Sequence, residues 1–330
     1  MINPRDILLG SQAGAVQIPV CDHYSGVEVR MRKSLALQAE MTEEFGACVF
    51  DVTLDCEDGA PVGGEVDHAH LVAQLALGAA ANARVAVRVH PIDEPAFETD
   101  VNIIVKKAGA RLSHIMLPKI ECAADIDRAL KSIDAAGASS ARTDLIPIHV
   151  LVESSHAIHN VFEIAAHPRL QSIGFGVMDF VSSHGGAIPA AGMTGLGQFQ
   201  HPLVVRAKLE IAAACHAFGK VPSHCVFTEF NDVEALTNAA RKAATELGYT
   251  RMWSIHPNQI RPILQAFSPT ESEIEMAANL LDAAAKVDWA PISFNGALHD
   301  RASYRYFWQV IERAHATGRP IPSNMSVYFS

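Results

Sequence analysis

The sequence lacks the short motifs that mark several common classes of protein. Its six cysteines are scattered without a Cys-x-x-Cys pair, so neither a zinc site nor a disulfide framework is indicated. No Gly-x-Gly-x-x-Gly or Walker pattern occurs, which argues against an open nucleotide-binding sheet. Gly-x-Ser-x-Gly is also absent, so no serine hydrolase site can be argued.

Excess basic charge and long apolar runs are missing as well. The chain has 26 Lys and Arg against 36 Asp and Glu, and its formal net charge of −10 argues against a general nucleic-acid binder. No stretch reaches the ~18 uninterrupted apolar residues of a membrane span. The amino terminus has no long apolar core followed by a cleavage signal. We therefore expect a cytoplasmic protein that binds neither nucleic acid nor a membrane.

The 330 residues instead contain a repeat of short apolar runs and amphipathic stretches rich in Ala and Leu. Apolar strands that alternate with helices are typical of a parallel sheet covered on both faces. The stretches 125–135 and 204–217 have the apolar spacing of helices packed on one face. The candidate strands are 47–54, 85–89, 114–117, 147–152, 172–177, 223–227 and 251–255.

The number of repeats favours a closed barrel. With an eighth strand expected within residues 28–37, eight units over roughly 250 residues match a (β/α)₈ TIM barrel. A doubly wound open sheet is the alternative, but its usual glycine-rich turn is missing. Ser268-Pro-Thr-Glu-Ser-Glu273 is a helix-capping pattern. We therefore expect a catalytic TIM barrel in residues 1–267, including an amino-terminal segment 1–27, and a carboxyl-terminal helical extension in 268–330.

Two carboxylates stand directly after apolar runs, one repeat apart. Glu153 follows the run 146–152, and Asp179 follows the run 173–178. If these runs are neighbouring parallel strands, both side chains emerge at the same carboxyl-terminal rim. Mg²⁺ typically takes one or two protein carboxylates and completes its shell with substrate oxygens. The pair Glu153 and Asp179 therefore predicts a magnesium site.

Other polar residues also stand at the ends of predicted strands. Taken singly, an acid there can cap the next helix, an arginine can form a structural ion pair, and a histidine before proline can belong to a turn. Together they share one rim, where the active site of a barrel is built from several strand ends. The candidate substrate-binding residues are Glu57, Asp58, Arg88, Lys119, Glu153 and His256.

Several segments occur in an order that resembles a known family. They are Asp55-Cys-Glu-Asp-Gly-Ala60, Val87-Arg-Val-His90, Leu117-Pro-Lys119, Val152-Glu153, Phe175-Gly-Val-Met-Asp179, Ile255-His-Pro-Asn-Gln-Ile260, Phe267-Ser-Pro-Thr-Glu-Ser-Glu273 and Phe294-Asn-Gly-Ala-Leu-His-Asp300. Over about residues 28–315 the chain resembles the citrate lyase β-subunit and malyl-CoA lyase group of the aldolase and citrate lyase superfamily.

The resemblance implies a TIM barrel that holds Mg²⁺ through Glu153 and Asp179. It also implies two catalytic residues. Arg88 would bind a substrate carboxylate or the developing carbonyl oxygen. Asp300 would be the acid/base that acts on the acetyl-CoA methyl group, at the rim of a neighbouring subunit. A homotrimer or homohexamer is expected for the same reason.

We therefore expect a Mg²⁺-dependent carbon–carbon lyase that cleaves or forms a 3-hydroxyacyl-CoA-type thioester, such as citryl-CoA or malyl-CoA. Its partners would be that thioester, or a related one, and a 2-keto acid, with acetyl-CoA as the other product. Mg²⁺ as a Lewis acid and the fork of an arginine suit the oxygen whose charge changes most. An acyl-CoA thioesterase or a CoA-independent class II keto-acid aldolase on the same fold is the nearest alternative. A non-catalytic subunit that binds an acyl thioester is an alternative from another class.

Overall fold

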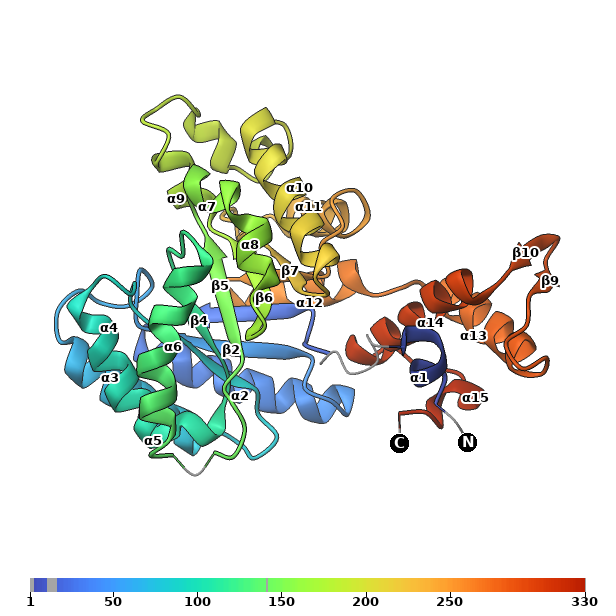
Figure 1. The fold of residues 1–330 in the computed structure, drawn as a ribbon, viewed down its shortest axis with the longest axis horizontal. Helices are drawn as coiled ribbons and strands as arrows, with labels where there is room; N and C mark the ends of the chain where they lie inside the picture. The colour runs from blue at the N-terminus through green and yellow to red at the C-terminus, as the bar shows by residue number, and fades with distance from the viewer. Residues whose placement is uncertain (1–2, 11–16, 141, 330) are drawn as a thin grey trace. The chain divides into compact units, whose positions relative to one another are not determined.

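The computed structural model describes residues 3–10, 17–140 and 142–329, which fall into two compact units. The larger unit comprises Val20–Ala266. The smaller unit combines the segment from Phe267 onward with amino-terminal residues that precede Val20. Figure 1 follows the chain through both units, coloured by residue number.

The larger unit is a closed barrel of parallel strands, which confirms the predicted TIM barrel. Consecutive strands pair with one another, and the first pairs with both the second and the last, so the sheet has no free edge. The strands are β1 (Cys21–Ser25), β2 (Phe50–Asp55), β3 (Val85–Arg88), β4 (Leu112–Leu117), β5 (Ile148–Val152), β6 (Leu170–Phe175), β7 (Val221–His224) and β8 (Arg251–Ser254).

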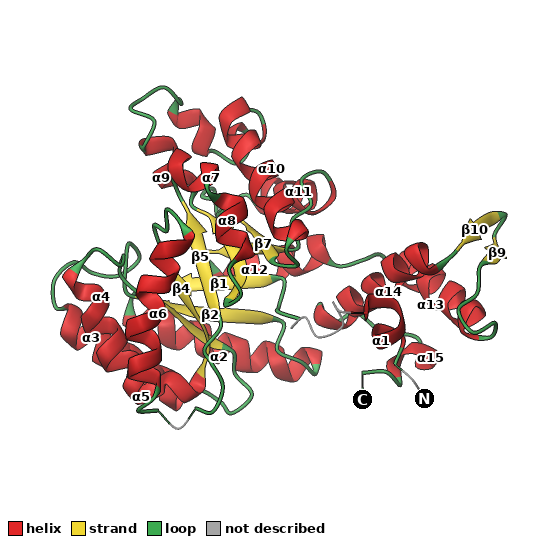
Figure 2. Cartoon of the chain, viewed as in Figure 1, coloured by secondary structure: helices red, strands yellow, loops and turns green. Residues whose placement is uncertain are grey.

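Helices connect the strands and lie outside them, as Figure 2 shows by colour. None of the described helices combines the length and the apolar character needed to cross a membrane. The helices of this unit are α2 (Glu28–Phe45), α3 (Glu65–Gly78), α4 (Pro95–Asp100), α5 (Lys106–Ala108), α6 (Ala123–Gly137), α7 (Ser155–His159), α8 (Val161–Ala166), α9 (Val177–Ser182), α10 (Pro202–Ala217), α11 (Val233–Thr245) and α12 (Pro257–Phe267), with a π-helical turn at Val101–Val105 and a 3₁₀ turn at Gly109–Arg111.

The strand predicted within residues 28–37 is wrong, because this segment belongs to helix α2. The missing strand is β1, which lies just before it and is buried along its whole length. Asp22 made this run look unlike a buried strand, yet its carboxylate lies 2.7 Å from the guanidinium of Arg251 inside the barrel. In α2 the buried residues recur every three to four positions, as expected for one face of a helix; they are Met31, Ser34, Gln38 and Met41.

Side chains inside the barrel form layers, because alternate residues of a strand point to the same side. The apolar middle layer consists of Tyr24, Met116, Leu151 and Trp253. A second layer of buried side chains lies two residues earlier on the same four strands. We call it the lower polar layer, and it consists of Asp22, His114, His149 and Arg251. Two residues after Leu151 comes Glu153, at the carboxyl-terminal rim. The middle layer therefore separates the lower polar layer from the rim.

The glycine-rich segment 184–202, which follows α9, contains two 3₁₀ turns at Ala190–Met193 and Gly197–Phe199. The backbone N–H of Gly195 donates to Glu229 Oε1 at 2.9 Å. A Cβ on Gly195 would lie 2.2 Å from the ring of Phe227, so only glycine fits there. Lys208 Nζ, from α10, donates to Gln198 Oε1 at 2.7 Å. These bonds tie the segment to α10 and to the connection after β7.

The smaller unit has its own apolar core, formed around Trp308. The predicted capping pattern is confirmed, because Thr270 Oγ1 accepts from the N–H of Glu273 and Glu273 Oε2 accepts from the N–H of Thr270. An antiparallel hairpin separates the two long helices. The elements are α13 (Glu271–Ala285), β9 (Ile292–Phe294), β10 (Ala297–His299), α14 (Arg301–Ala316), α15 (Ser323–Ser326) and the amino-terminal helix α1 (Pro4–Leu9).

The division of the chain differs from the predicted one at the amino terminus. Residues 1–27 were expected to belong with the barrel, whereas α1 belongs to the smaller unit. Leu8 and Leu9 of this helix pack into the core that contains Trp308. Arg5 also forms an ion pair with Glu312 of α14. Apolar burial and this ion pair both explain why α1 joins the carboxyl-terminal helices.

Candidate active site at the rim of the barrel

A cavity of about 840 Å³ lies at the carboxyl-terminal ends of the strands. Most of the residues predicted for the site meet there. Those that line it are Asp58, Arg88, Glu153, Asp179 and His256. Two further predicted residues, Glu57 and Lys119, are not among the described residues that line the cavity; they form ion pairs beside it.

Glu153 is the first residue after β5 and is only 6% exposed. Its Oε2 atom is buried and has no hydrogen-bond partner among the described residues. Burial and the negative charges of Asp179 and Glu57 raise the pKa of Glu153 to about 8, against the opposing effect of Arg88 and Lys119. A buried carboxylate of this kind strongly favours a nearby cation. The cation would give Oε2 a partner and would offset the repulsion from Asp179 and Glu57.

Asp179 lies in the first turn of α9, immediately beyond β6. Gly176, the residue that caps α9, makes room for the other acid. A Cβ on Gly176 would lie 2.5 Å from Cγ and Oε1 of Glu153. Glycine at this position therefore allows Glu153 to stand beside α9. Two neighbouring carboxylates, one with an unpartnered buried oxygen, are hard oxygen donors of the kind that fits Mg²⁺.

Arg88 ends β3 and is fixed in place by two carboxylates. Its Nε and Nη2 donate to Oδ1 and Oδ2 of Asp55 at 2.7 and 2.6 Å, a bidentate pair. Its Nη1 lies 2.8 Å from Oε2 of Glu57. Burial alone would lower the pKa of Arg88, but Asp55 and Glu57 outweigh it and raise that pKa. The cavity thus has a permanent, rigidly oriented positive charge in its wall.

Glu57 links Arg88 to Lys119, whose Nζ donates to Glu57 Oε1 at 2.6 Å. Lys119 follows β4 in a left-handed conformation with a φ of 52°. These contacts hold Arg88 in position. That Glu57 and Lys119 bind substrate stays a prediction. Asp58 is exposed and faces the cavity directly. His256, the last of the predicted set, stacks on Phe230 with ring centroids 5.1 Å apart.

Asp300 lies in the smaller unit, and it is not among the residues that line the cavity. It caps helix α14, where its Oδ1 accepts from the backbone N–H of Ala302 at 2.9 Å and of Ser303 at 3.4 Å. The side chain of Ser303 completes this capping box. Asp300 is exposed, so the cap leaves its carboxylate open to solvent.

Sequence reasoning missed the β1 side of the cavity. His23, Tyr24 and Ser25 line it, together with Trp253 of β8. None of them was predicted, and for the first three the reason is that β1 itself was not recognised. The available signal was the run Val20-Cys-Asp-His-Tyr24, in which Val20, Asp22 and Tyr24 would share one face of a strand.

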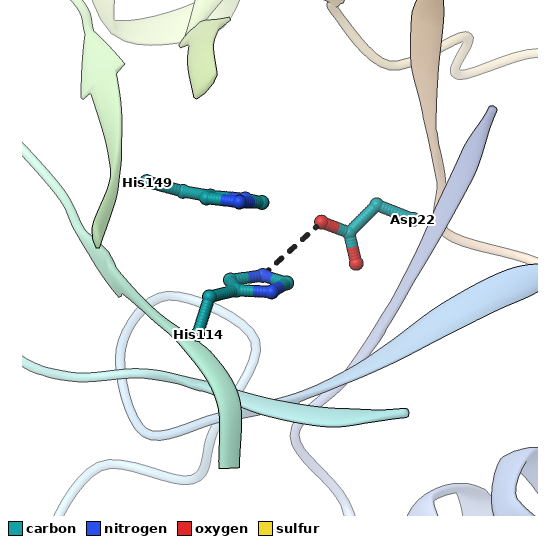
Figure 3. Close-up of side chains that lie close together, drawn as sticks. All are labelled: Asp22, His114 and His149. Carbon is teal, nitrogen blue, oxygen red and sulfur yellow. Dashed lines mark ion pairs between the residues drawn. The ribbon is translucent and has the colours of Figure 1, made fainter. Parts of the chain in front are cut away.

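The lower polar layer holds a second group that could be considered for a metal ion. Asp22, His114 and His149 each offer a ligand atom, and these atoms lie within 4.8 Å of one another (Figure 3). The two imidazole rings, however, stack face to face with centroids 3.6 Å apart and planes at 14°. Nitrogen lone pairs in parallel rings do not converge on one ion, because imidazole binds a metal in the ring plane.

The partner of Asp22 also argues for a structural role. Its Oδ2 lies 2.7 Å from Nη2 of Arg251, which leaves little reason for a second cation. Burial alone would raise the pKa of Asp22, but the charge of Arg251 outweighs it and lowers that pKa. Burial, His114 and Arg251 hold the pKa of His149 well below its usual value, so this ring is neutral. We interpret the lower polar layer as a buried ion-pair network, which leaves Glu153 and Asp179 at the rim as the candidate metal ligands.

Comparison with known proteins agrees with the geometry. Residues 34–257 match the family model described as HpcH/HpaI aldolase/citrate lyase. The chain is 32% identical over 245 residues to the L-malyl-CoA/β-methylmalyl-CoA lyase of Cereibacter sphaeroides, and the alignment covers 69% of this chain and 75% of that protein.

Two solved structures show the same fold. A crystal structure of a citrate lyase from Burkholderia xenovorans LB400 has 45% sequence identity and a TM-score of 0.82, and the match covers 100% of this chain and 99% of that one. Protein CitE from Mycobacterium tuberculosis, crystallised with magnesium, acetoacetate and coenzyme A, has 21% identity and a TM-score of 0.65. That match covers 91% of this chain and 98% of the other.

Proposed function

Because this chain belongs to the HpcH/HpaI aldolase/citrate lyase family and is a carbon–carbon lyase, we propose that it acts with Mg²⁺ on a 3-hydroxyacyl thioester of the citryl-CoA or malyl-CoA type. Cleavage would give acetyl-CoA and a 2-keto acid, and the reverse reaction would join them. The relatives support the thioester, since one is named a malyl-CoA lyase and one is crystallised with magnesium, acetoacetate and coenzyme A.

The observation that carries this proposal is the unpartnered, buried Oε2 of Glu153 in a cavity shared with Asp179 and Arg88. Glu153 and Asp179 would hold the ion, which when bound supplies a Lewis acid for the oxygens of the keto acid. Arg88 adds a fixed guanidinium whose position is set by Asp55. Together the ion and Arg88 would put positive charge near the oxygen that becomes negative, and fixed charges of this kind stabilise a transition state without reorganisation.

Cleavage requires a proton to leave the hydroxyl group and another to reach the methyl carbon of the acetyl thioester. We assign the second transfer to Asp300, acting in the cavity of a neighbouring subunit of a homotrimer or homohexamer. Its exposed carboxylate at the start of α14 is compatible with this role. A carboxylate can serve as such an acid/base when the neighbouring site encloses it.

The reaction type is tested by incubating the protein with malyl-CoA or citryl-CoA and Mg²⁺ while free thiol and keto acid are measured separately. A lyase releases keto acid without free thiol, whereas a thioesterase releases free thiol. A CoA-independent aldolase instead produces pyruvate or oxaloacetate from free hydroxy keto acids. Turnover of neither thioester would contradict the proposal.

The role of Asp300 is tested by mixing two inactive variants. Asp300→Asn keeps a good helix cap, so the fold of α14 is retained. Glu153→Gln removes the metal ligand of the barrel. If Asp300 serves a neighbour, mixed oligomers regain part of the activity, because some sites then combine an intact Glu153 with an intact Asp300. Absence of recovery in proven mixed oligomers would contradict the assignment.

A further inference from the structure

The cavity extends well beyond the metal pair. Its volume of about 840 Å³ lies in the range of sites that enclose a drug-sized ligand, larger than a small keto acid requires. Its lining includes the apolar side chains of Val226, Phe230 and Trp253 as well as polar residues such as Ser25 and His256. His23 belongs to this lining and is only 2% exposed. A buried polar ring calls for hydrogen-bond partners.

The tautomer of His23 follows from its hydrogen bonds. Its Nδ1 lies 3.0 Å from Oγ of Ser254. Ser254 Oγ in turn donates to the backbone carbonyl oxygen of His256 at 2.9 Å. A carbonyl oxygen only accepts, so the single proton of Ser254 is already used. Ser254 must therefore accept from His23, and Nδ1 of His23 carries the ring proton.

The other ring nitrogen is left as an acceptor. No hydrogen bond joins Nε2 of His23 to a described side chain, although the ring also interacts with the backbone of Ser254. Burial and the proximity of His256 lower the pKa of His23 to about 4, despite the charge of Asp22, so the ring is neutral at physiological pH. The edge contact with Phe50, at 6.4 Å between centroids and 79° between planes, holds the ring in orientation. A fixed, neutral acceptor thus stands in the wall.

We propose that His23 determines substrate specificity by accepting a hydrogen bond through Nε2 from an amide N–H in the carrier arm of the thioester. This inference rests on the proposed function. A carrier arm of the coenzyme A type alternates methylene groups with secondary amides, which suits a lining that combines apolar side chains with the acceptor of His23. An arm without the amide leaves His23 buried and unpaired, and sites built to hydrogen-bond a group reject analogues that lack it.

Two variants of His23 distinguish the roles of its two ring nitrogens. His23→Asn places an amide N–H near the position of Nδ1 and so keeps the bond to Ser254, but it removes the acceptor. His23→Gln reaches the position of Nε2 with its carbonyl oxygen and gives up the bond to Ser254. We expect His23→Asn to raise the KM for the CoA thioester about tenfold with little change in kcat, and His23→Gln to raise it less.

A shortened substrate provides the matched control. The ethanethiol thioester of the same hydroxy acid keeps the reacting groups and lacks every amide of the arm. His23→Asn should leave the KM for this thioester unchanged. An equal rise of KM for both thioesters, or a larger rise in His23→Gln than in His23→Asn, would overturn the assignment.

The pH profile and a binding measurement separate this inference from the proposed reaction. Because the ring is neutral, the ratio of KM between His23→Asn and the wild type should stay constant from pH 6 to 8; a ratio that follows a titration contradicts a neutral acceptor. Calorimetry with free coenzyme A tests the contact without turnover, and His23→Asn should weaken binding about tenfold. If coenzyme A binds equally to both proteins the inference fails, and if no thioester turns over while this difference holds, only the proposed reaction fails.

Discussion

The barrel buries charge at both its ends, and the two ends are balanced differently. In the lower polar layer Nη2 of Arg251 lies 2.7 Å from the carboxylate of Asp22, and it lies equally close to the carboxylate of Asp51 on β2. Asp51 has a second partner in Arg84, at 2.6 Å. Two carboxylates therefore meet two guanidinium groups, and this end is neutral without any bound ion.

At the rim, the same comparison of carboxylates with their basic partners leaves an excess of negative charge. Arg88 and Lys119 are matched by Asp55 and Glu57, with which they form ion pairs. Glu153 and Asp179 then remain. Arg30 and Lys33 also line this cavity, but neither of the two acids forms an ion pair with a described residue. One divalent ion would supply the missing positive charge. On this comparison, an unbalanced buried charge rather than a cluster of ligand-type side chains marks the rim as the proposed site of a metal ion.

The largest effect should come from removing one of the excess acids. Glu153→Gln eliminates a ligand for the ion, and we expect kcat/KM to fall by at least about 1000-fold, several kcal/mol in the barrier. Calorimetry should show weaker Mg²⁺ binding. Because the change also removes a buried, repelled carboxyl, the metal-free protein should unfold at no lower urea concentration than the wild type. Full Mg²⁺ affinity in this variant would contradict the charge comparison.

An equivalent change in the lower polar layer should lower the free energy of unfolding instead. Asp22→Asn leaves the fully buried Arg251 short of one partner, and breaking a buried ion pair in this way typically costs about 3–5 kcal/mol. Urea unfolding measures the loss. Mg²⁺ affinity of the folded variant should stay within about twofold of the wild type. A strong loss of metal binding here would instead favour an ion between Asp22, His114 and His149.

The support of Arg88 should matter next. Asp55→Asn removes the negative charge and the bidentate pairing, so Arg88 loses its orientation and we expect kcat to fall about 100-fold. If Asp55 acts only through Arg88, adding Asp55→Asn to Arg88→Ala should cause little further loss. Additive losses in the double variant would show that Asp55 has a separate role.

The pH dependence should give the smallest effect. The pKa of Glu153 is about 8 when folded against an ordinary 4.5, so the folded state binds this proton more tightly. Metal-free protein should therefore lose stability as the pH rises from about 4.5 to about 8. Mg²⁺ must displace the proton, and its affinity should rise about tenfold per pH unit up to pH 8 and then level off. Isothermal titration at several pH values measures this slope, and a flat profile would contradict it.

The sequence predicted most of the barrel because its strands are apolar. Seven strands were found from runs such as Pro147–Val152, and the positions of Glu153 and Asp179 at neighbouring strand ends followed from the repeat. β1 was missed because a buried Asp22 is compensated by Arg251, more than two hundred residues later in the chain. Hydropathy is a local property, whereas this compensation depends on closure of the barrel.

The partners within the site could not be predicted for a similar reason. Glu57 was expected to bind substrate, yet its two oxygens meet Arg88 and Lys119, which come from the ends of two later strands. Strand ends predict that polar groups converge, but only distances decide which of them pair and which remain free. The role of His23 likewise depends on Ser254, which β8 brings beside β1.

The apolar middle layer of Tyr24, Met116, Leu151 and Trp253 bears on how such enzymes evolve. This layer lies between the charged residues of the lower polar layer and the charged residues of the candidate active site at the rim. Distant, unconnected sites usually contribute additively, so the rim can accumulate substitutions without loosening the base. Related enzymes can therefore acquire new substrates through changes at the rim while they keep the same lower polar layer.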